Sequence, residues 1–247
     1  LKSIDLILRE VNNLRRIGQQ YSAQNHGTLS IATTHTQARY VLPKPVSRLR
    51  AAYPDVTVSL HQGSPDQVAR MVIEEVAEIG MATESLANYP ELVTLPCYEW
   101  QHMLVMPKDH PLAGVRQISI ERLQEHPLVT YHPSFTGRSR IDQAFAHQGL
   151  TPQIALEAID SDVIKTYVSL GMGVGVVAEM AVQDGLPDNL VSRPAGQLFG
   201  SNMARVAFKR GSYLRHFVLE FAHMLSDRLN RDLVLKALEG RNSDYEL

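Results

Sequence analysis

From residue 28 onwards, short β-branched segments alternate with amphipathic ones, and this alternation limits the fold of the 247-residue chain more than any other feature. The first predicted strands are 28–33, 56–60 and 79–82, and the predicted helices between them are 38–52 and 65–77. A β-α-β-α-β order predicts parallel strands with helices packed on the faces of the sheet. We therefore expect an α/β fold.

A second block of alternating elements begins near Cys97. Its predicted elements are strands 92–96 and 102–106, helix 120–124, strand 128–131, helix 138–148, strand 153–158, helix 163–170 and strand 174–177. A loop rich in glycine and proline follows over 185–200, before a strand at 203–208 and one long amphipathic helix that ends near residue 238. Two α/β blocks joined by two connections are typical of hinged binding proteins, which hold a ligand in the cleft between their lobes.

The first 24 residues have a different pattern. Ile4, Ile7, Val11 and Leu14 are spaced three and four residues apart, which is a heptad stripe that Gly18 interrupts. The stripe fits either a surface helix that packs on its own domain or a dimerising linker helix. Because the chain begins with Leu rather than Met, we expect that residues are missing upstream.

Composition excludes several classes of protein. The 24 basic and 26 acidic residues give a net charge of −2, which is not the balance of a strongly basic nucleic-acid binder. No apolar run approaches the roughly 18 residues that cross a bilayer, so no membrane partner is expected. Cys97 is the only cysteine and has no disulfide partner in the chain, which fits a cytoplasmic protein. We interpret it as a structural thiol rather than a nucleophile.

The motifs of common enzymes are absent. The sequence holds no G-x-S-x-G, no H-E-x-x-H and no G-x-x-x-x-G-K-[ST]. The glycines at 171, 173 and 175 follow a predicted helix and precede a strand, the reverse of a dinucleotide-binding loop, so we expect a helix C-cap and a tight turn. We expect no catalytic residue, no metal site and no cofactor.

Three hydroxyl-rich turns remain, at 33–37, 83–85 and 134–139. Each follows a predicted strand and precedes a helix, so all three are expected at the carboxyl edge of a parallel sheet, where ligands bind. Free N–H groups and hydroxyls at such turns suit an anion. Serine, threonine and aspartate before helices are more often plain N-caps, and we interpret Ser64 and Asp160 that way. Arg138 supplies charge to the ligand or is simply a solvated residue of the first helical turn.

Five strings resemble LysR-type transcriptional regulators, in particular those of the cysteine-biosynthesis branch. They are T-T-H-T-Q-A-R-Y at 33–40, H-Q-G-S-P at 61–65, L-P-C-Y at 95–98, F-T-G-R-S at 135–139, and D-V-I-K-T-Y-V at 162–168 with L-G-M-G-V-G-V after it. The resemblance covers residues 1 to about 200. It implies two Rossmann-like lobes with a hinge and an interlobe cleft, as in periplasmic binding proteins, preceded by a linker helix.

The implied organisation is a linker helix over 1–26, lobe I over 27–96 and 198–240, and lobe II over 97–197. A DNA-binding domain would lie upstream, and the whole protein would be a homo-oligomer that meets promoter DNA and RNA polymerase. The implied ligand is N- or O-acetylserine, or sulfate or thiosulfate. The family's anion contacts fall on Thr34, Thr36, Gln37, Thr83 and Thr136; Tyr98, Trp100 and Thr130 are weaker pocket candidates.

Two other classes stay open from the sequence. A transport-type solute-binding protein has the same architecture without a role at DNA. A hydrolase or transferase would use Cys97 as its nucleophile.

Overall fold

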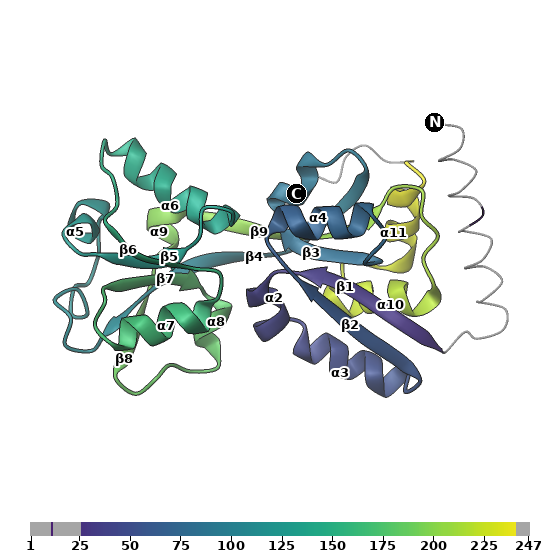
Figure 1. Cartoon of the computed structure of the whole chain (residues 1–247), viewed down its shortest axis with the longest axis horizontal. Coiled ribbons are helices and arrows are strands. Elements are labelled where there is room, and N and C mark those ends of the chain that lie inside the picture. The colour runs from purple at the N-terminus through teal and green to yellow at the C-terminus, as the bar shows by residue number, and fades with distance from the viewer. Residues whose placement is uncertain (1–10, 12–25, 241–247) are drawn as a thin grey trace. The chain divides into compact units, whose positions relative to one another are not determined.

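We describe a computed structural model of the chain, which covers Val11 and residues 26–240. The predicted linker helix therefore lies outside the described residues, apart from Val11. The chain forms two compact units (Figure 1). Unit 1 comprises the described residues up to Tyr98 and from Ala204 onwards, and unit 2 comprises Glu99–Met203. The expected lobe boundaries were after Pro96 and after Gln197.

The sheet of unit 1 has three neighbouring parallel strands, then an antiparallel strand over 201–209, and beside it the start of the strand over 92–107, which continues into unit 2. Strands β1 (Gly27–Thr33), β2 (Val56–Gln62) and β3 (Ile79–Thr83) are parallel, with β1 between the other two. Strand β9 (Ser201–Lys209) pairs with β3 in the antiparallel direction. The predicted parallel arrangement of the first three strands is confirmed.

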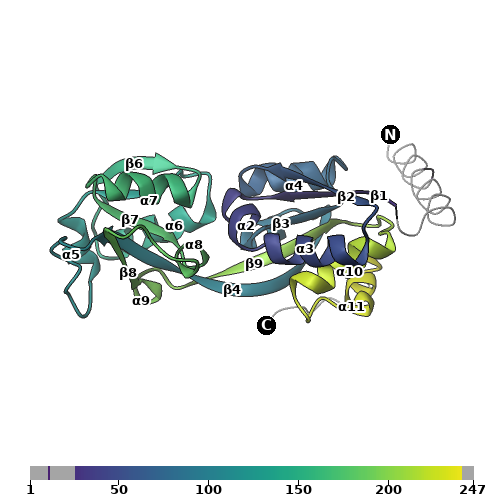
Figure 2. The ribbon, with the colours of Figure 1, turned by 90° about the horizontal axis from the view of Figure 1, so that it is seen from below.

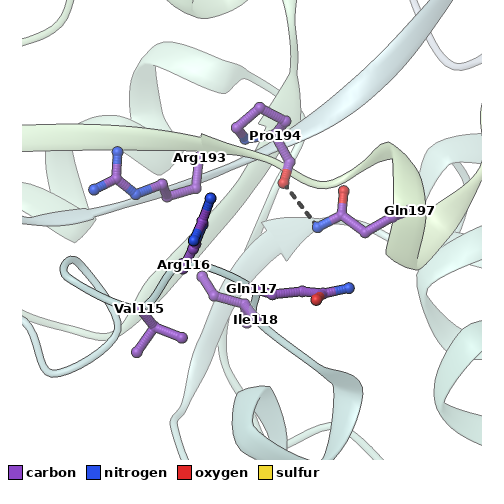
Figure 3. A pocket seen from close by; sticks show the side chains of 7 residues that line it. All are labelled: Val115, Arg116, Gln117, Ile118, Arg193, Pro194 and Gln197. Atoms are coloured by element: carbon purple, nitrogen blue, oxygen red, sulfur yellow. Dashed lines mark hydrogen bonds between the residues drawn. The ribbon is translucent and has the colours of Figure 1, made fainter.

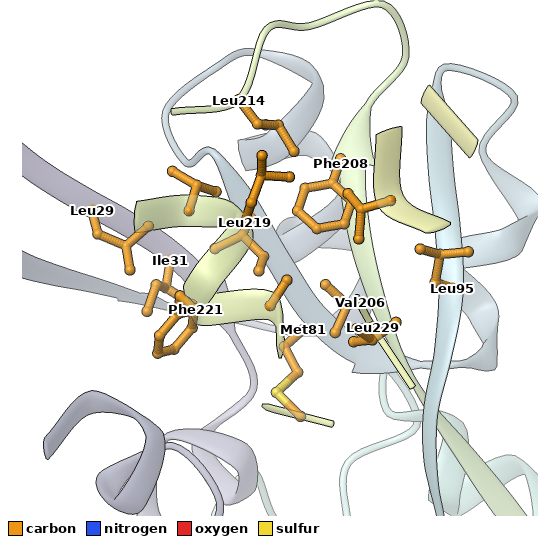
Figure 4. Packing of buried hydrophobic residues seen from close by; sticks show 14 of the residues in the cluster. Leu29, Ile31, Met81, Leu95, Val206, Phe208, Leu214, Leu219, Phe221 and Leu229 are labelled. Carbon is orange, nitrogen blue, oxygen red and sulfur yellow. The ribbon is translucent and has the colours of Figure 1, made fainter. Parts of the chain in front are cut away.

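Helices cover both faces of this sheet. Figure 2 shows α4 (Pro65–Ile73) on one face and α3 (Pro43–Ala52) and α10 (His216–Leu225) on the other. The remaining helices are α2 (His35–Tyr40), η1 (Glu84–Asn88) and α11 (Arg231–Leu238). The larger core of unit 1 packs Met81 and Phe208 from the sheet against Phe221 and Leu229 from the C-terminal segment (Figure 4).

Unit 2 has a mixed sheet. Strand β4 (Leu92–Pro107) enters it from unit 1, and β5 (Leu128–Tyr131) lies between β7 (Val174–Ala178) and β6 (Ile154–Ala158), parallel to both. Strand β4 is antiparallel to β7 and also to β8 (Leu190–Pro194). The helices of unit 2 are α5 (Ile120–Gln124), α6 (Thr136–His147), α7 (Ser161–Ser169), α8 (Met180–Gln183) and α9 (Gly196–Phe199).

Several predicted elements differ in extent, as does the helix predicted over 65–77, which ends at Ile73. The two strands predicted over 92–106 are the single strand β4. Helix 38–52 is two helices, because a new one begins at Pro43, which needs no N–H partner in a first turn. The predicted loop 185–200 contains β8 and α9. The long C-terminal helix is interrupted before Asn230, whose side chain accepts a 2.9 Å hydrogen bond from the Leu233 N–H and caps α11.

The glycine-rich turn after α7 forms as predicted. Helix α7 ends at Ser169, Gly171 has a positive φ of 81°, and β7 begins at Val174. No helix within residues 26–240 combines the length and apolarity that crossing a membrane requires.

Replacing Gly173 should unfold unit 2 more easily than replacing Gly149. Gly173 has φ +142°, and an added Cβ would lie 2.1 Å from the Pro127 carbonyl oxygen. Gly149 also has a positive φ, of 69°, but open space around its Cβ position. Urea denaturation should show a loss of about 1–2 kcal/mol for Gly149→Ala from backbone strain alone, and a clearly larger loss for Gly173→Ala. Equal losses would contradict the close packing of Gly173 on Pro127.

Candidate functional site

The first candidate group lies where β1 ends. The backbone leaves β1 at Thr33, and Thr34 is the N-cap of α2 in an extended conformation. The Thr34 side chain makes no capping hydrogen bond and has no other hydrogen-bond partner among the described residues, although the residue is 94% buried. This hydroxyl is therefore not used as a plain helix cap.

Gln37 lies one turn further along α2 and is also buried. Its Oε1 accepts a hydrogen bond from the Tyr98 hydroxyl, which fixes the orientation of the amide. No described residue accepts from the Gln37 amide nitrogen, which leaves that nitrogen able to donate to a ligand. Tyr98, a weaker pocket candidate from the sequence, thus has a positioning role for Gln37.

Thr83 ends β3, the strand next to β1. Because Thr33 is opposite Met81 in the parallel register, Thr34 and Thr83 both lie at the carboxyl edge of neighbouring strands. The Thr83 hydroxyl lies 3.2 Å from that of Ser85. Thr36 is half-buried in α2. The structure therefore brings four of the five predicted contacts to one edge of the unit 1 sheet.

The fifth predicted contact, Thr136, belongs to unit 2. It is the first residue of α6 and follows β5, and it is half-buried. The helix begins two residues earlier than its predicted start at Arg138. Arg138 is buried and is neither a free charge nor solvated: its Nε donates to Asp142 at 2.8 Å and its Nη1 bonds to Glu157 and to the Tyr131 carbonyl. Both sequence interpretations of Arg138 were wrong.

A polar cluster lies beside the start of α6. In the described part of the chain, four buried side-chain atoms have no hydrogen-bond partner, and all belong to unit 2: Trp100 Nε1, His102 Nε2, Thr130 Oγ1 and Asn202 Oδ1. The rings of Trp100 and His102 are 5.0 Å apart, and His102 Nδ1 lies 3.5 Å from Asn202 Nδ2. An added Cβ at Gly137 would lie 2.9 Å from His102 Nε2. An unsatisfied buried polar group costs about 1–3 kcal/mol, so this concentration is unusual for a purely structural interior.

The remaining sequence candidates have structural roles. Ser64 forms a capping box with Gln67, and Asp160 caps α7, both as predicted. Burial raises the pKa of the Cys97 thiol to about 12, and its Sγ lies 3.8 Å from the Leu225 carbonyl in the unit 1 core. At neutral pH this thiol is protonated and a poor nucleophile. Within residues 26–240, no three histidine, cysteine, aspartate or glutamate side chains are grouped as metal ligands.

Comparison with known proteins decides the family. Residues 22–230, which are most of the chain, match the LysR substrate binding domain. The chain belongs to this family. Relatives of this LysR domain include the HTH-type transcriptional regulator CysB of Burkholderia cenocepacia, 49% identical over all 247 residues and 79% of that protein. The regulator cbl of Escherichia coli is 41% identical over 98% of this chain and 77% of that protein.

A solved structure agrees with the sequence relatives. The cofactor-binding domain of the Cbl transcriptional regulator superposes with a TM-score of 0.82 at 42% identity, over 87% of this chain and 94% of that one. The comparisons confirm the LysR-type effector-binding domain and its two-lobe α/β fold. They favour a regulator over a solute-binding protein, because the relatives are named transcriptional regulators.

Sequence reasoning missed His102 and gave Trp100 little weight. A histidine on a strand that alternates buried and exposed residues carries no sign of an unpaired ring nitrogen. The partners that define the cluster, Gly137 and Asn202, are more than 30 residues away along the chain. Only the fold brings them together.

The buried imidazole should make the protein less stable in mild acid. Burial, and to a lesser extent the charge of Arg140, lowers the pKa of His102 to about 3, from 6.5. The unfolded chain therefore binds a proton at this site as the pH falls below 6.5, whereas the folded chain does not. The free energy of unfolding is not reduced by His102 above pH 6.5. From there down to pH 3 it falls by up to about 1.4 kcal/mol per pH unit because of this residue. Denaturation of wild type and His102→Gln across this range should show a shallower loss in the variant, and parallel losses would contradict the assignment.

Proposed function

We propose that the domain senses an effector for a transcriptional activator of sulfate assimilation and cysteine biosynthesis. The proposed ligand is N- or O-acetylserine, or a sulfate-like anion such as sulfate or thiosulfate. Thr34, Thr36, Gln37, Thr83 and Thr136 are the proposed contacts. The unpartnered Thr34 hydroxyl, next to a Gln37 amide held by Tyr98, supports this proposal best.

The proposed contacts have a common chemistry. Hydroxyl and amide groups donate hydrogen bonds without carrying a net charge, so they suit both an oxyanion and the polar groups of an acetylated amino acid. A hydrogen bond to a charged group contributes about 1.5–3 kcal/mol. Several such bonds, from residues of both lobes, would be enough to favour one lobe arrangement over another.

The proposed mechanism is allosteric and involves no covalent step. A ligand that binds one lobe arrangement more tightly shifts the population towards it, and couplings of about 1–3 kcal/mol are typical of such switches. The full-length protein would pass this shift to promoter DNA and RNA polymerase in the cytoplasm. The high pKa and burial of Cys97 support a regulator rather than an enzyme with a thiol nucleophile.

Calorimetry should detect the loss of single contacts. We expect acetylserine or sulfate to bind the wild-type chain at least about tenfold more tightly than Thr34→Val and Thr136→Ala, because each variant removes one hydrogen-bond donor to the ligand. Thr57→Val is the matched control, since Thr57 is exposed on β2, outside the proposed site. Unchanged binding in both site variants would remove the assignment. Loss in Thr34→Val alone would limit the site to lobe I.

We also propose that the chain associates with a second copy of itself through α7 and the residues that flank it. LysR-type regulators typically act as oligomers, and four exposed apolar side chains are spaced four, four and three residues apart here: Ile159 before α7, Val163 and Tyr167 in it, and Leu170 after it. Leu170 is 71% exposed. A second copy that covered these side chains would remove the apolar surface from water.

Light scattering after size-exclusion chromatography tests this interface. Leu170→Glu should lower the measured mass towards that of one chain, because a buried glutamate would have no partner in an apolar contact. Val76→Glu, at an exposed apolar position in unit 1, should leave the mass unchanged. The same mass for wild type and Leu170→Glu would place the interface elsewhere.

A further inference from the structure

Unit 2 contains a cavity that the proposed function does not use. It has a volume of about 570 Å³ and is formed by the segment after Ala113 together with β8 and α9. Figure 3 shows the residues that line it: Val115, Arg116, Gln117, Ile118, Arg193, Pro194 and Gln197. Two arginines and two glutamines thus share the wall with aliphatic side chains, and no acidic side chain lines the cavity.

Neither arginine is neutralised by a described carboxylate. Arg116 is exposed and has no hydrogen bond or ion pair to a described residue through its side chain. Arg193 donates from Nε and Nη2 to the Ala113 carbonyl oxygen, with the Nε bond 3.1 Å long, and has no other side-chain partner. The cavity therefore carries two positive charges that are compensated only by a carbonyl dipole.

The backbone around the cavity is held in place. The Leu112 N–H donates to His110 Nδ1 at 3.1 Å, and the Ala113 N–H donates to the His110 carbonyl at 2.8 Å, which fixes the turn before the lining segment. Arg193 is opposite Leu104 in the antiparallel register of β8 with β4. Gln197 Nε2 donates to the Pro194 carbonyl at 3.2 Å. Strand β8 thus positions Arg193, and a hydrogen-bonded turn precedes the segment that carries Arg116.

We propose that this cavity binds a small ligand through an oxyanion group, namely a phosphate, sulfate or carboxylate. The planar guanidinium of Arg193, already oriented by Ala113, and the unpartnered guanidinium of Arg116 supply charged donors. In Figure 3 the Arg116 side chain lies between those of Arg193 and Gln117. Val115 and Ile118 provide contact for a short apolar part of the ligand.

This site is separate from the threonine contacts in chemistry and in residues. Its donors are charged, and it shares no residue with the set Thr34, Thr36, Gln37, Thr83 and Thr136. It would give the domain a second ligand site. If the two sites are coupled, a ligand at one changes the affinity of the other by the same factor in both directions. The proposal does not depend on the identity of the effector at the threonines.

Titration of the ¹⁵N-labelled chain with inorganic phosphate tests the site by NMR. We expect saturable shifts in the backbone amide signals of residues 115–118, 193 and 197, with chloride adjusted to hold ionic strength constant. Arg116→Gln should raise the dissociation constant read from these shifts about tenfold or more. This variant removes no contact seen in the fold, so its loss of binding is not a loss of folding.

Three further variants complete the experiment. Arg122→Gln removes an exposed arginine of nearby α5 that does not line the cavity, and Thr136→Ala alters only the threonine set; both should keep the shifts. Arg193→Lys keeps the charge but loses the two hydrogen bonds from the guanidinium to the Ala113 carbonyl oxygen, and should weaken phosphate binding. Shifts that do not saturate, that persist in Arg116→Gln, or that disappear in Thr136→Ala would overturn the proposal. The last result would assign phosphate to the threonine contacts instead.

Discussion

The pairing of β9 with β3 is the interaction on which unit 1 depends. It brings a strand from the far end of the chain beside the N-terminal parallel strands, with Gly80 opposite Ala207 and Thr83 opposite Ala204. The same strand carries Val206 and Phe208 into the core with Phe217 and Phe221 of α10. Without this pairing β3 would be an unprotected edge, and the larger core of unit 1 would lose Val206 and Phe208.

Close packing on the other face of β3 makes the pairing specific. An added Cβ at Gly80 would lie 2.8 Å from Val72 Cγ2, so α4 can approach β3 closely only at a glycine. Helix α4 on one face and strand β9 at the edge then fix the position of the end of β3. Because Thr83 is the last residue of that strand, its position follows from core packing rather than from local turn geometry. If Thr83 contacts a ligand as proposed, its fixed position would lower the entropy cost of binding.

The sequence predicted those features that short-range chemistry determines. The Thr34 turn, the Ser64 capping box and the turn at Gly171 each depend on a few neighbouring residues. Features that depend on distant partners were missed. The continuity of β4 was missed because Glu99 and Gln101 are exposed where the strand passes between units, and the alternation of buried residues changes phase there. The interruption before Asn230 was hidden by an apolar spacing that continues across it.

The same limit applied to charge. Arg138 looked available in sequence, yet Asp142 and Glu157 neutralise it, and only Asp142 is a helical neighbour at i+4. Nothing in the sequence indicated that Arg193 could bind a ligand, because its segment was predicted to be a loop. Whether an arginine can bind a ligand depends on which carboxylates the fold places near it, and a single sequence does not contain that information.

The difference between neutral and charged donors has a consequence for selectivity. The proposed donors Thr34 and Gln37 are buried, so they would recognise an anion through fixed dipoles where dissolved salt screens little. Arg116, by contrast, is exposed, and chloride competes for its charge. If both proposed sites bind, the affinity at the threonines would depend little on ionic strength, whereas the affinity at Arg116 would fall as salt rises. Desolvation, rather than net charge, separates the two affinities.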